Sequence, residues 1–248
     1  MTDEVIISRT DSVLEIRMNR PAKKNALTRA MYAAMAGGLK DAAADQEIRA
    51  VVLSGEGDMF TAGNDISDFQ AISTGTPAAN SDAVGEFLHA LVGAEKPVIA
   101  AVSGSGVGIG LTMLLHCDIV VMADDAQLVA PFTQLGLVPE AASSLLLPTL
   151  VGHKKAFMIL GLGQPVGAAE AIELGIASFI APRGEVHEHA LKAAQQCAAR
   201  PPEALQITKR LLRNKEPAIE RLETERKYFA ERLKSPEARA AFAAFLKR

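Results

Sequence analysis

The sequence predicts an α/β fold in which short strands alternate with helices. Short apolar runs bounded by turn residues recur along much of the chain. Segments whose apolar residues are spaced as on one helix face lie between these runs. The chain of 248 residues is 49% hydrophobic, which is enough for a sizeable buried core. The order strand, helix, strand is typical of crossover units in a largely parallel sheet.

The first elements establish this order. Val5–Ser8 and Val13–Met18 are short and rich in β-branched residues, and we expect them to form a hairpin. Thr28 is a suitable N-cap for a helix that ends near Ala44. Ile48–Ser54 follows as a buried strand, so the helix between the two strands completes the first crossover unit.

The stretch from Lys96 to Cys117 is the centre of the predicted site. A buried strand, Pro97–Val102, is followed by glycines at alternate positions and then by a helical segment, Leu111–His116. The glycines are Gly104, Gly106, Gly108 and Gly110. A strand, a glycine turn and a helix start aim free backbone N–H groups at one point, and glycine leaves room for a ligand to reach them. We therefore expect a site for negative charge that is built from backbone.

A nucleotide site, a packing turn and a membrane span are the other interpretations of this stretch. The glycine spacing differs from the G-x-G-x-x-G pattern of dinucleotide sites, and the G-K-[ST] end of a phosphate-binding loop is absent. A glycine turn required only for close packing remains an alternative. The stretch is about as long as one membrane span, but its four glycines, two serines and one threonine favour a buried core.

Three loops accompany the glycine-rich stretch. Gly55–Asp65 contains further glycines and leads into a predicted helix near Ile66, and Ser73–Asn80 is small and polar, as expected of a mobile loop beside a site. After the strands Asp118–Ala123 and Gln127–Val129, the third loop is the apolar segment Ala130–Glu140.

Glu140 follows Pro139 directly before a predicted helix, Ala141–Leu147. Proline and an acid are common at a helix start, where the carboxylate favours the helix dipole, and this is one interpretation of Glu140. The other interpretation is that Glu140 is a proton-transfer group. It rests on the apolar neighbours of Glu140 and on the lack of any Lys or Arg between Lys96 and Lys154. A carboxyl group in such surroundings has a raised pKa, which suits proton transfer near neutral pH.

The remainder of the chain is predicted to be mostly helical. Helices are expected at Gly85–Ala94, Lys154–Leu160, Gly167–Glu173, Glu185–Ala199, Glu203–Asn214, Pro217–Lys234 and Glu237–Lys247, with a short strand at Ser178–Ile180. Arg200-Pro201-Pro202 is a break, and the helices after it are charged and amphipathic. We predict a core domain over residues 1–199 and a helical appendage over residues 200–248 that packs on the core or on another subunit.

Composition and the two termini disfavour several classes of protein. A net charge of −3 is unlike that of a nucleic-acid-binding protein. Cys117 and Cys197 provide neither a disulfide framework nor metal-ligand spacing, so no metal site is expected. The N-terminus lacks the basic and apolar regions of a signal peptide, and the C-terminal residues FLKR are not a peroxisomal tripeptide. We expect a soluble cytoplasmic protein that binds neither nucleic acid nor membranes.

Loops that offer backbone N–H groups, together with a carboxylate in apolar surroundings, fit a reaction in which a proton moves next to a carbonyl group. The carbonyl oxygen becomes an enolate in the transition state, and preorganised donors stabilise it. None of the five histidines has an obvious nucleophile partner, so a Ser-His-Asp triad is not indicated.

Three motifs of this chain resemble the crotonase superfamily, also called the enoyl-CoA hydratase/isomerase family. In order, they are FTAGNDI at Phe60–Ile66, KPVIAAVSGSGVGIGLTMLLHCDIVVMADDAQL at Lys96–Leu128 and PFTQLGLVPE at Pro131–Glu140. The resemblance covers nearly the whole chain and implies a crotonase-like (ClpP/crotonase) fold, a spiral of ββα units with a C-terminal helical trimerisation region. It also implies an acyl-CoA thioester as substrate, no cofactor besides that CoA, and a homotrimer or a dimer of trimers.

The resemblance further implies roles for particular residues. An oxyanion hole is expected from the N–H groups of Asn64 and Ile109, and the bulk of the isoleucine could narrow the site because many members have glycine there. Glu140 occupies the position of the catalytic glutamate in Δ3,Δ2-enoyl-CoA isomerases. The other residues expected to contact substrate are Lys23 or Lys24 near the CoA phosphates, Ala62 near the adenine, Phe132 and Leu137 along the acyl chain, and Gly63, Asp65, Ile66 and Gly108.

Two departures from the family pattern favour one subclass. Hydratases carry two glutamates that add water across a double bond, and the corresponding positions here are Thr112 and Phe132. PFTQLGLVPE followed by Ser143-Ser144 resembles the Δ3,Δ2-enoyl-CoA isomerases instead. A single carboxylate suits a 1,3-proton shift because no water has to be positioned. The prediction is an isomerase that converts 3-enoyl-CoA to 2-trans-enoyl-CoA in fatty acid β-oxidation.

Three alternatives remain beside this prediction. One is another crotonase-type chemistry, such as that of an enoyl-CoA hydratase or a lyase. Another is a catalytically silent protein that binds acyl-CoA in the same pocket. The third is a Rossmann-type nucleotide enzyme, which the glycine spacing disfavours.

Overall fold

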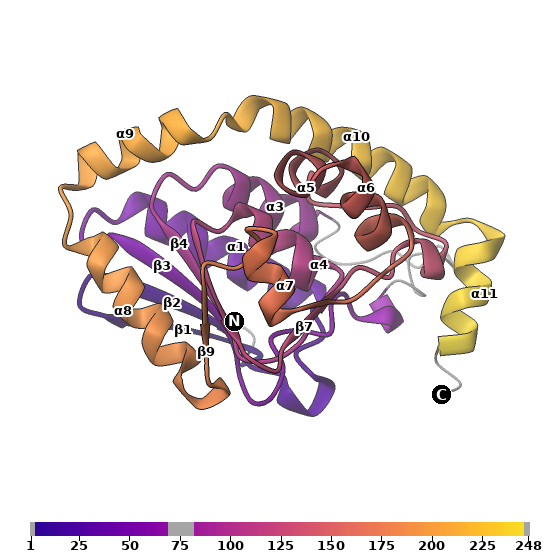
Figure 1. Ribbon diagram of the computed structural model, residues 1–248, viewed down its shortest axis with the longest axis horizontal. Coiled ribbons are helices and arrows are strands. Elements are labelled where there is room, and N and C mark those ends of the chain that lie inside the picture. Colours follow the sequence, from indigo (N-terminus) through magenta and orange to yellow (C-terminus); the bar gives the residue numbers. More distant parts are fainter. Residues whose placement is uncertain (1–2, 69–81, 246–248) are drawn as a thin grey trace.

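A six-stranded sheet forms the centre of the fold in the computed structural model, which describes residues 3–68 and 82–245 (Figure 1). Its strands, in spatial order, are β1 Val5–Thr10, β2 Val13–Met18, β3 Ala50–Gly55, β4 Val98–Val102, β6 Ile119–Ala123 and β9 Phe179–Ala181. The predicted hairpin of β1 and β2 is confirmed, and the pairs from β2 to β9 are parallel. The predicted loop Ser73–Asn80 lies outside the described residues.

A smaller, three-stranded sheet carries the glycine-rich stretch. It consists of β5 Gly106–Val107, β7 Gln127–Val129 and β8 Val166–Gly167, in that order. Single parallel bridges join Thr61 to Gly106 and Leu27 to Asn64. The segments around Leu27, around residues 61–64 and around Gly106 are far apart in the sequence, and these bridges place them side by side.

The helices are distributed over the whole chain. Their bounds are α1 Arg29–Ala44, α3 Ala83–Val92, α4 Ile109–Thr112, α5 Ser143–Val151, α6 His153–Ala156, α7 Ala168–Glu173, α8 Val186–Ala198, α9 Pro202–Leu212, α10 Lys215–Leu233 and α11 Pro236–Phe245. Short 3₁₀ turns are η1 Pro21–Lys23, η2 Met113–His116, η3 Thr133–Leu135 and η5 Arg183–Glu185, and η4 Phe157–Gly161 is a π-helical turn. Thr28 caps α1 as predicted, because its side chain accepts the Met31 N–H over 3.3 Å.

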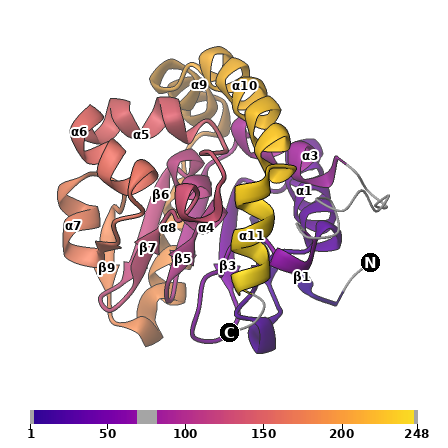
Figure 2. The same cartoon turned by 90° about the vertical axis from the view of Figure 1, so that its right-hand side faces the viewer.

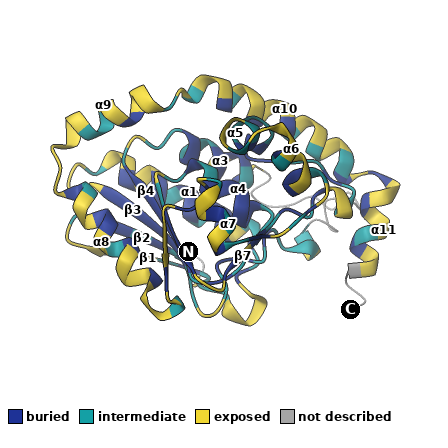
Figure 3. Ribbon diagram, in the orientation of Figure 1, coloured by how far each residue is buried: buried dark blue, intermediate teal, exposed yellow. Residues whose placement is uncertain are grey.

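Helices cover both faces of the central sheet. α1 packs on one face, where Gly38 lies against Ile16 of β2. α8 packs on the opposite face, where His187 contacts Glu15 of β2 over 2.9 Å, since neighbouring residues of a strand point to opposite sides. The central strands between these helices are buried (Figure 3).

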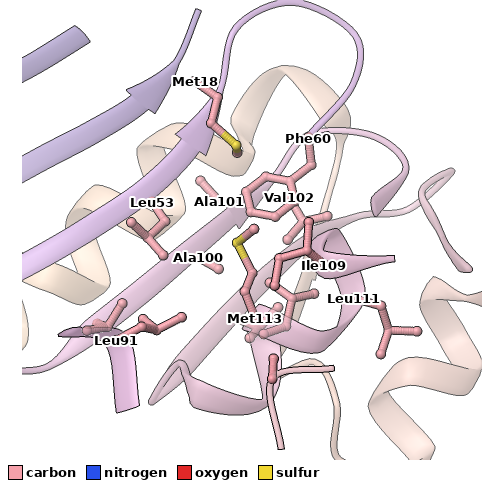
Figure 4. Close-up of a cluster of buried hydrophobic side chains, with 14 of the residues drawn as sticks. Met18, Leu53, Phe60, Leu91, Ala100, Ala101, Val102, Ile109, Leu111 and Met113 are labelled. Atoms are coloured by element: carbon pink, nitrogen blue, oxygen red, sulfur yellow. The ribbon is translucent and has the colours of Figure 1, made fainter. Parts of the chain in front are cut away.

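The core extends from the central sheet to the start of α4. Phe60, Val102, Ile109 and Met113 are fully buried and meet in one hydrophobic cluster (Figure 4). Burial of such side chains contributes about 1.5–3 kcal/mol each to folding. The cluster therefore anchors the first turn of α4 and the backbone that precedes it.

The three C-terminal helices arch over the core, as Figures 1 and 2 show. α10 packs on α3 and α5, and α11 packs on η3. The predicted boundary between residues 199 and 200 falls in the turn between α8 and α9. The appendage thus contacts the core of its own chain. Within the described ranges, no helix is long and apolar enough to cross a membrane.

Two helix starts close to the predicted site differ from the prediction by two residues each. The helix expected from Leu111 begins at Ile109 and continues as the 3₁₀ turn η2. The helix expected from Ala141 begins at Ser143, because Ala141 and Ala142 have left-handed backbone conformations with φ values of 60° and 55°. Non-glycine residues adopt this conformation only when their surroundings enforce it.

Candidate active site

Asn64 and Ile109 lie at equivalent positions on two adjacent backbone segments. Thr61 is bridged in parallel to Gly106, and the Val107 N–H donates to the Thr61 carbonyl over 3.0 Å. Counting three residues onward from each bridged residue reaches Asn64 on one segment and Ile109 on the other. Parallel pairing therefore brings these two residues to the same end of the pair.

Both segments turn at a glycine just before these residues. Gly63 and Gly108 have φ values of 88° and 58°, which favour glycine. A Cβ on Gly63 would lie 2.7 Å from the Val107 carbonyl oxygen, so the two backbones approach too closely for any other residue without a shift. The loop therefore needs glycine at position 63 for its close approach and its φ, whereas position 108 favours glycine for its φ alone.

The backbone N–H groups of Asn64 and Ile109 are available to a ligand. The Leu27 N–H donates to the Gly63 carbonyl over 2.8 Å and the Asp65 N–H donates to the Leu27 carbonyl over 3.0 Å, so the Asn64 N–H points away from Leu27. The Ile109 N–H starts α4, where the first N–H groups have no acceptor within the helix. In the part of the chain that the structure describes, neither N–H donates to a protein acceptor. Such a pair is suited to bind a carbonyl oxygen that gains negative charge.

The side chain of Ile109 does not narrow this site. It is fully buried and points into the hydrophobic cluster with Phe60 and Met113 (Figure 4). A small cavity of about 40 Å³ is bordered by Asn64 and by Gly108, the residue before Ile109, and its described lining does not include Ile109. The lining consists of Ala62, Gly63, Asn64, Ile66, Val107, Gly108, Pro131, Phe132, Leu135, Leu137 and Phe229.

Glu140 lines a second, larger cavity of about 380 Å³. Its apolar wall is formed by Leu27, Tyr32, Val84, Leu88, Phe229 and Leu233, and its polar rim includes Arg29, Asp65, Asp68, Asp82, Glu223, Arg226 and Lys227. Asn64 borders both cavities, so the residue that carries one of the two N–H donors also lies next to the cavity of the Glu140 carboxyl group. An apolar cavity with few polar groups is typical of a small-molecule site.

The pKa of Glu140 is raised to about 8, as its apolar sequence neighbours predict. Burial is the largest cause, since only 5% of the residue is exposed. The negative charge of Glu225 raises the pKa further, and the hydrogen bond from Asn64 lowers it. The carboxyl group can therefore both take and return a proton near neutral pH.

A short relay of hydrogen bonds orients Glu140. The buried Tyr32 hydroxyl donates to the Asn64 side-chain oxygen over 2.6 Å, and the Asn64 Nδ2 donates to Glu140 Oε1 over 3.3 Å. Because the tyrosine occupies the amide oxygen, the amide NH₂ faces the carboxylate. Burial, and after it the charge of Glu140, keep the pKa of Tyr32 well above its ordinary value, so the hydroxyl remains a donor.

Comparison with known proteins establishes the family. A family model described as enoyl-CoA hydratase/isomerase matches residues 8–248. The chain belongs to this family. Its members act on acyl-CoA thioesters, and the expected crotonase-like fold with a C-terminal helical region is confirmed by solved structures of the family.

Individual relatives of this family member differ in their reactions. Enoyl-CoA delta isomerase 2 of Rattus norvegicus is 34% identical over 215 residues, which are 86% of this chain, and the chain spans 55% of that relative's length. 2,3-Dehydroadipyl-CoA hydratase of Escherichia coli (strain K12) is 32% identical over 247 residues, which are 99% of this chain and 96% of the hydratase. The structure of Pseudomonas aeruginosa OdaA is 43% identical, with a TM-score of 0.94 over 100% of both chains.

Thr112 and Phe132, which the resemblance to the family places at the positions of the two hydratase glutamates, are both buried. Thr112 is fully buried, and its hydroxyl donates to the Gly108 carbonyl over 3.4 Å. Phe132 is 4% exposed and lines the smaller cavity together with Leu137. The larger cavity beside Glu140 is lined by Leu27, which precedes α1, by Leu88 of α3 and by Leu233 of α10, and the sequence analysis named none of these leucines as site residues.

The remaining predicted residues lie around the loop that carries Asn64. The Ala62 N–H donates to the Lys24 carbonyl over 2.9 Å, which places the basic turn next to Ala62. Lys23 and Lys24 are exposed and line neither cavity among the described residues. Asp65 forms an ion pair with Arg20 over 2.6 Å, which ties the loop to the start of the chain.

The interpretation of Glu140 as an acid in the first helical turn is wrong. α5 begins at Ser143, and its first turn contains no acidic residue. Glu225 of α10, 83 residues away, accepts the Ala142 N–H over 2.6 Å instead. Sequence spacing gave no signal for the contact of Glu225 with Ala142 or for the contact of Tyr32 with Asn64. No cluster of three or more His, Cys, Asp and Glu within the described ranges could hold a metal ion.

Proposed function

We propose that this protein is a Δ3,Δ2-enoyl-CoA isomerase that converts 3-enoyl-CoA to 2-trans-enoyl-CoA. One observation carries the proposal: Glu140 is a buried carboxyl group with a pKa of about 8 in the same region as the Asn64 and Ile109 N–H groups. The resemblance to the family, which places Thr112 and Phe132 at the positions of the two hydratase glutamates, supports it. The similarity to the rat delta isomerase supports the same reaction.

The other carboxylates at the larger cavity are engaged elsewhere. Asp65 pairs with Arg20, Asp82 with Arg226, and Glu223 with His89 and Arg226. Asp68 accepts the Arg29 backbone N–H over 3.1 Å. Carboxylates that already accept from a cation or a backbone N–H are less suited to remove a proton from carbon near neutral pH. Glu140 is therefore the group to which the proposal assigns the proton transfer.

The proposed reaction is a proton shift without a net change in composition. The Asn64 and Ile109 N–H groups donate to the thioester oxygen, and ionised Glu140 removes a proton from C2 of the 3-enoyl chain. The C–H electron pair conjugates with the carbonyl, and the resulting dienolate is stabilised by the two donors. Glu140 then returns the proton to C4, which leaves the double bond between C2 and C3. No cofactor besides the substrate's CoA takes part.

The proposal also includes assembly into a homotrimer or a dimer of trimers and a role in fatty acid β-oxidation. Phe157, Met158 and Leu162, on the surface around α6, are 58%, 41% and 60% exposed. Apolar side chains grouped in this way are common at subunit interfaces. Sedimentation of the purified protein tests the assembly.

The first experiment incubates the protein with a 3-enoyl-CoA in D₂O and follows the conjugated product and deuterium at C2 and C4. We expect product formation by the wild type and at least about a 10³-fold loss in Glu140→Gln, because the general base is removed. Fold and thioester binding should persist in the variant. Wild-type turnover by Glu140→Gln would contradict the mechanism.

A hydratase is the second candidate, because the E. coli relative that covers nearly the whole chain is one. Rapid hydration of crotonyl-CoA with no isomerisation would favour it. Tight thioester binding with neither product nor deuterium exchange would instead indicate a silent acyl-CoA binder.

A further inference from the structure

Glu225, in the C-terminal helix α10, reaches the turn that follows Glu140. Its Oε2 accepts the Ala142 N–H over 2.6 Å and its Oε1 accepts the Ser144 N–H over 2.8 Å. The residue is only 5% exposed. Both carboxylate oxygens are thus used to bind backbone at the start of α5, where N–H groups have no acceptor within the helix. A carboxylate with two such donors is best satisfied when it is ionised.

The turn that Glu225 holds is strained. Ala141 and Ala142 are consecutive non-glycine residues with φ values of 60° and 55°. Such conformations persist only where the surrounding structure enforces them. The strain directs Glu140 away from the helix and into the larger cavity, since Glu140 immediately precedes the two alanines.

A second contact supports the same turn from the core. The buried His116 Nε2 contacts the Ala141 carbonyl over 2.6 Å. Arg213, between α9 and α10, donates to His116 Nδ1 and, over 2.7 Å, to the His116 carbonyl. Since Nδ1 accepts from the arginine, Nε2 carries the proton and donates to Ala141. The C-terminal appendage therefore contributes to both supports of the turn, through Glu225 directly and through Arg213.

Glu225 also acts on Glu140 through its charge. The groups that face Glu140 are Tyr32 from α1, Asn64 from the loop after β3, and Glu225 from α10. Of these, Glu225 is the group that bears a negative charge while it binds the two N–H groups, and Arg221 partly offsets it. A like charge disfavours ionisation of Glu140, so the proton of the pair resides on Glu140 at rest.

We propose that Glu225 is a positioning residue for Glu140, which holds the strained turn after Glu140 through the Ala142 and Ser144 N–H groups. The inference rests on the proposed role of Glu140 as the base. It assigns a catalytic consequence to a residue of the C-terminal appendage that does not touch the two backbone donors.

Two variants separate the two effects of Glu225. Glu225→Gln removes the charge and replaces one acceptor oxygen by an amide NH₂, whereas Glu225→Asp keeps the charge on a shorter side chain. We expect both to lower the pH-independent kcat about 10- to 100-fold with KM little changed, because the base is displaced from its proton. In Glu225→Gln, the pH at which activity appears should also move below that of the wild type, whereas in Glu225→Asp it should stay near pH 8.

The control is Glu220→Gln, which makes the same charge change at an exposed position of the same helix. It should leave kcat and the pH profile as in the wild type. Thermal unfolding and acyl-CoA binding of every variant are measured in parallel, so that a loss of fold is seen directly. If Glu225→Gln does not fold, the kcat of Glu225→Asp still decides the positioning role.

The outcomes distinguish this inference from the proposed function. Deuterium exchange at C2 of a saturated acyl-CoA reports on the base and the two N–H donors whatever the natural reaction is. Exchange that is lost in Glu140→Gln but unchanged in rate and pH profile in both Glu225 variants would overturn the positioning role alone. Wild-type protein without exchange or isomerisation would instead overturn the role of Glu140. Exchange slowed in both Glu225 variants, with the pH profile shifted in Glu225→Gln, supports the inference.

Discussion

The Asn64 side chain donates a hydrogen bond to Glu140 over 3.3 Å, while the backbone N–H of the same residue donates to no protein acceptor within the described part of the chain. One residue thus contacts the proposed base through its side chain and supplies one of the two proposed oxyanion donors through its backbone. This arrangement couples the position of the base to that of the oxyanion site, and it leads to predictions for each part.

The activity of the wild-type protein should rise with pH. Glu140 must be ionised to remove a proton, and burial raises its pKa to about 8. The ionised fraction, and with it kcat/KM, is expected to increase as the pH rises through 8 and to level off above it. Initial rates of isomerisation between pH 6 and 10 check this, each corrected for enzyme stability. A flat profile across pH 8 would contradict the assignment of Glu140 as the titrating base.

Replacement of Asn64 by alanine should affect Glu140 but retain the backbone donor. We expect kcat to fall about 10- to 100-fold, because the carboxylate loses its orienting bond. The pH at which activity appears should move upward, since the bond from Asn64 lowers the pKa of Glu140. This shift is opposite in sign to that expected for Glu225→Gln.

Tyr32→Phe tests the outer end of the same relay. The variant leaves the Asn64 side-chain oxygen without its buried donor, which costs about 1–3 kcal/mol of stability. We expect a smaller loss of kcat than in Asn64→Ala, in the same direction. Tyr228→Phe is the matched control, because Tyr228 is 54% exposed. Equal effects of the two tyrosine variants would show that the relay has no role.

Gly63→Ala should impair the oxyanion site. The alanine would adopt a φ of 88° and place its Cβ 2.7 Å from the Val107 carbonyl oxygen, so the backbone must shift. We expect a destabilisation of about 1–3 kcal/mol and a marked fall in kcat, because the Asn64 N–H moves with the backbone.

Gly37→Ala is the control for this substitution. Gly37 lies within α1, and nothing lies within 4 Å of the added Cβ. The substitution should raise stability by up to about 1 kcal/mol and leave kcat unchanged. Denaturant unfolding and steady-state rates measure both variants, and a Gly63→Ala protein as active as Gly37→Ala would contradict the close-approach argument.

Local patterns were sufficient to predict much of the fold. The hairpin, the cap at Thr28 and the strands before and after the glycine-rich stretch depend on neighbouring residues, so periodicity and turn residues reveal them. The raised pKa of Glu140 was also predictable, because its flanking sequence is apolar and contains no cation. The three motifs in order indicated the family.

The sequence by itself thus determined the order of the elements, the family and the identity of the candidate base. Only the tertiary structure decided how Thr61 and Gly106 are registered, that Tyr32 orients Asn64, and that Glu225 holds the turn after Glu140. The physical reason is that buried N–H groups and carboxylates take their partners from whichever segment packs against them. That packing joins residues 32, 64, 140 and 225, and no local period of the sequence records it.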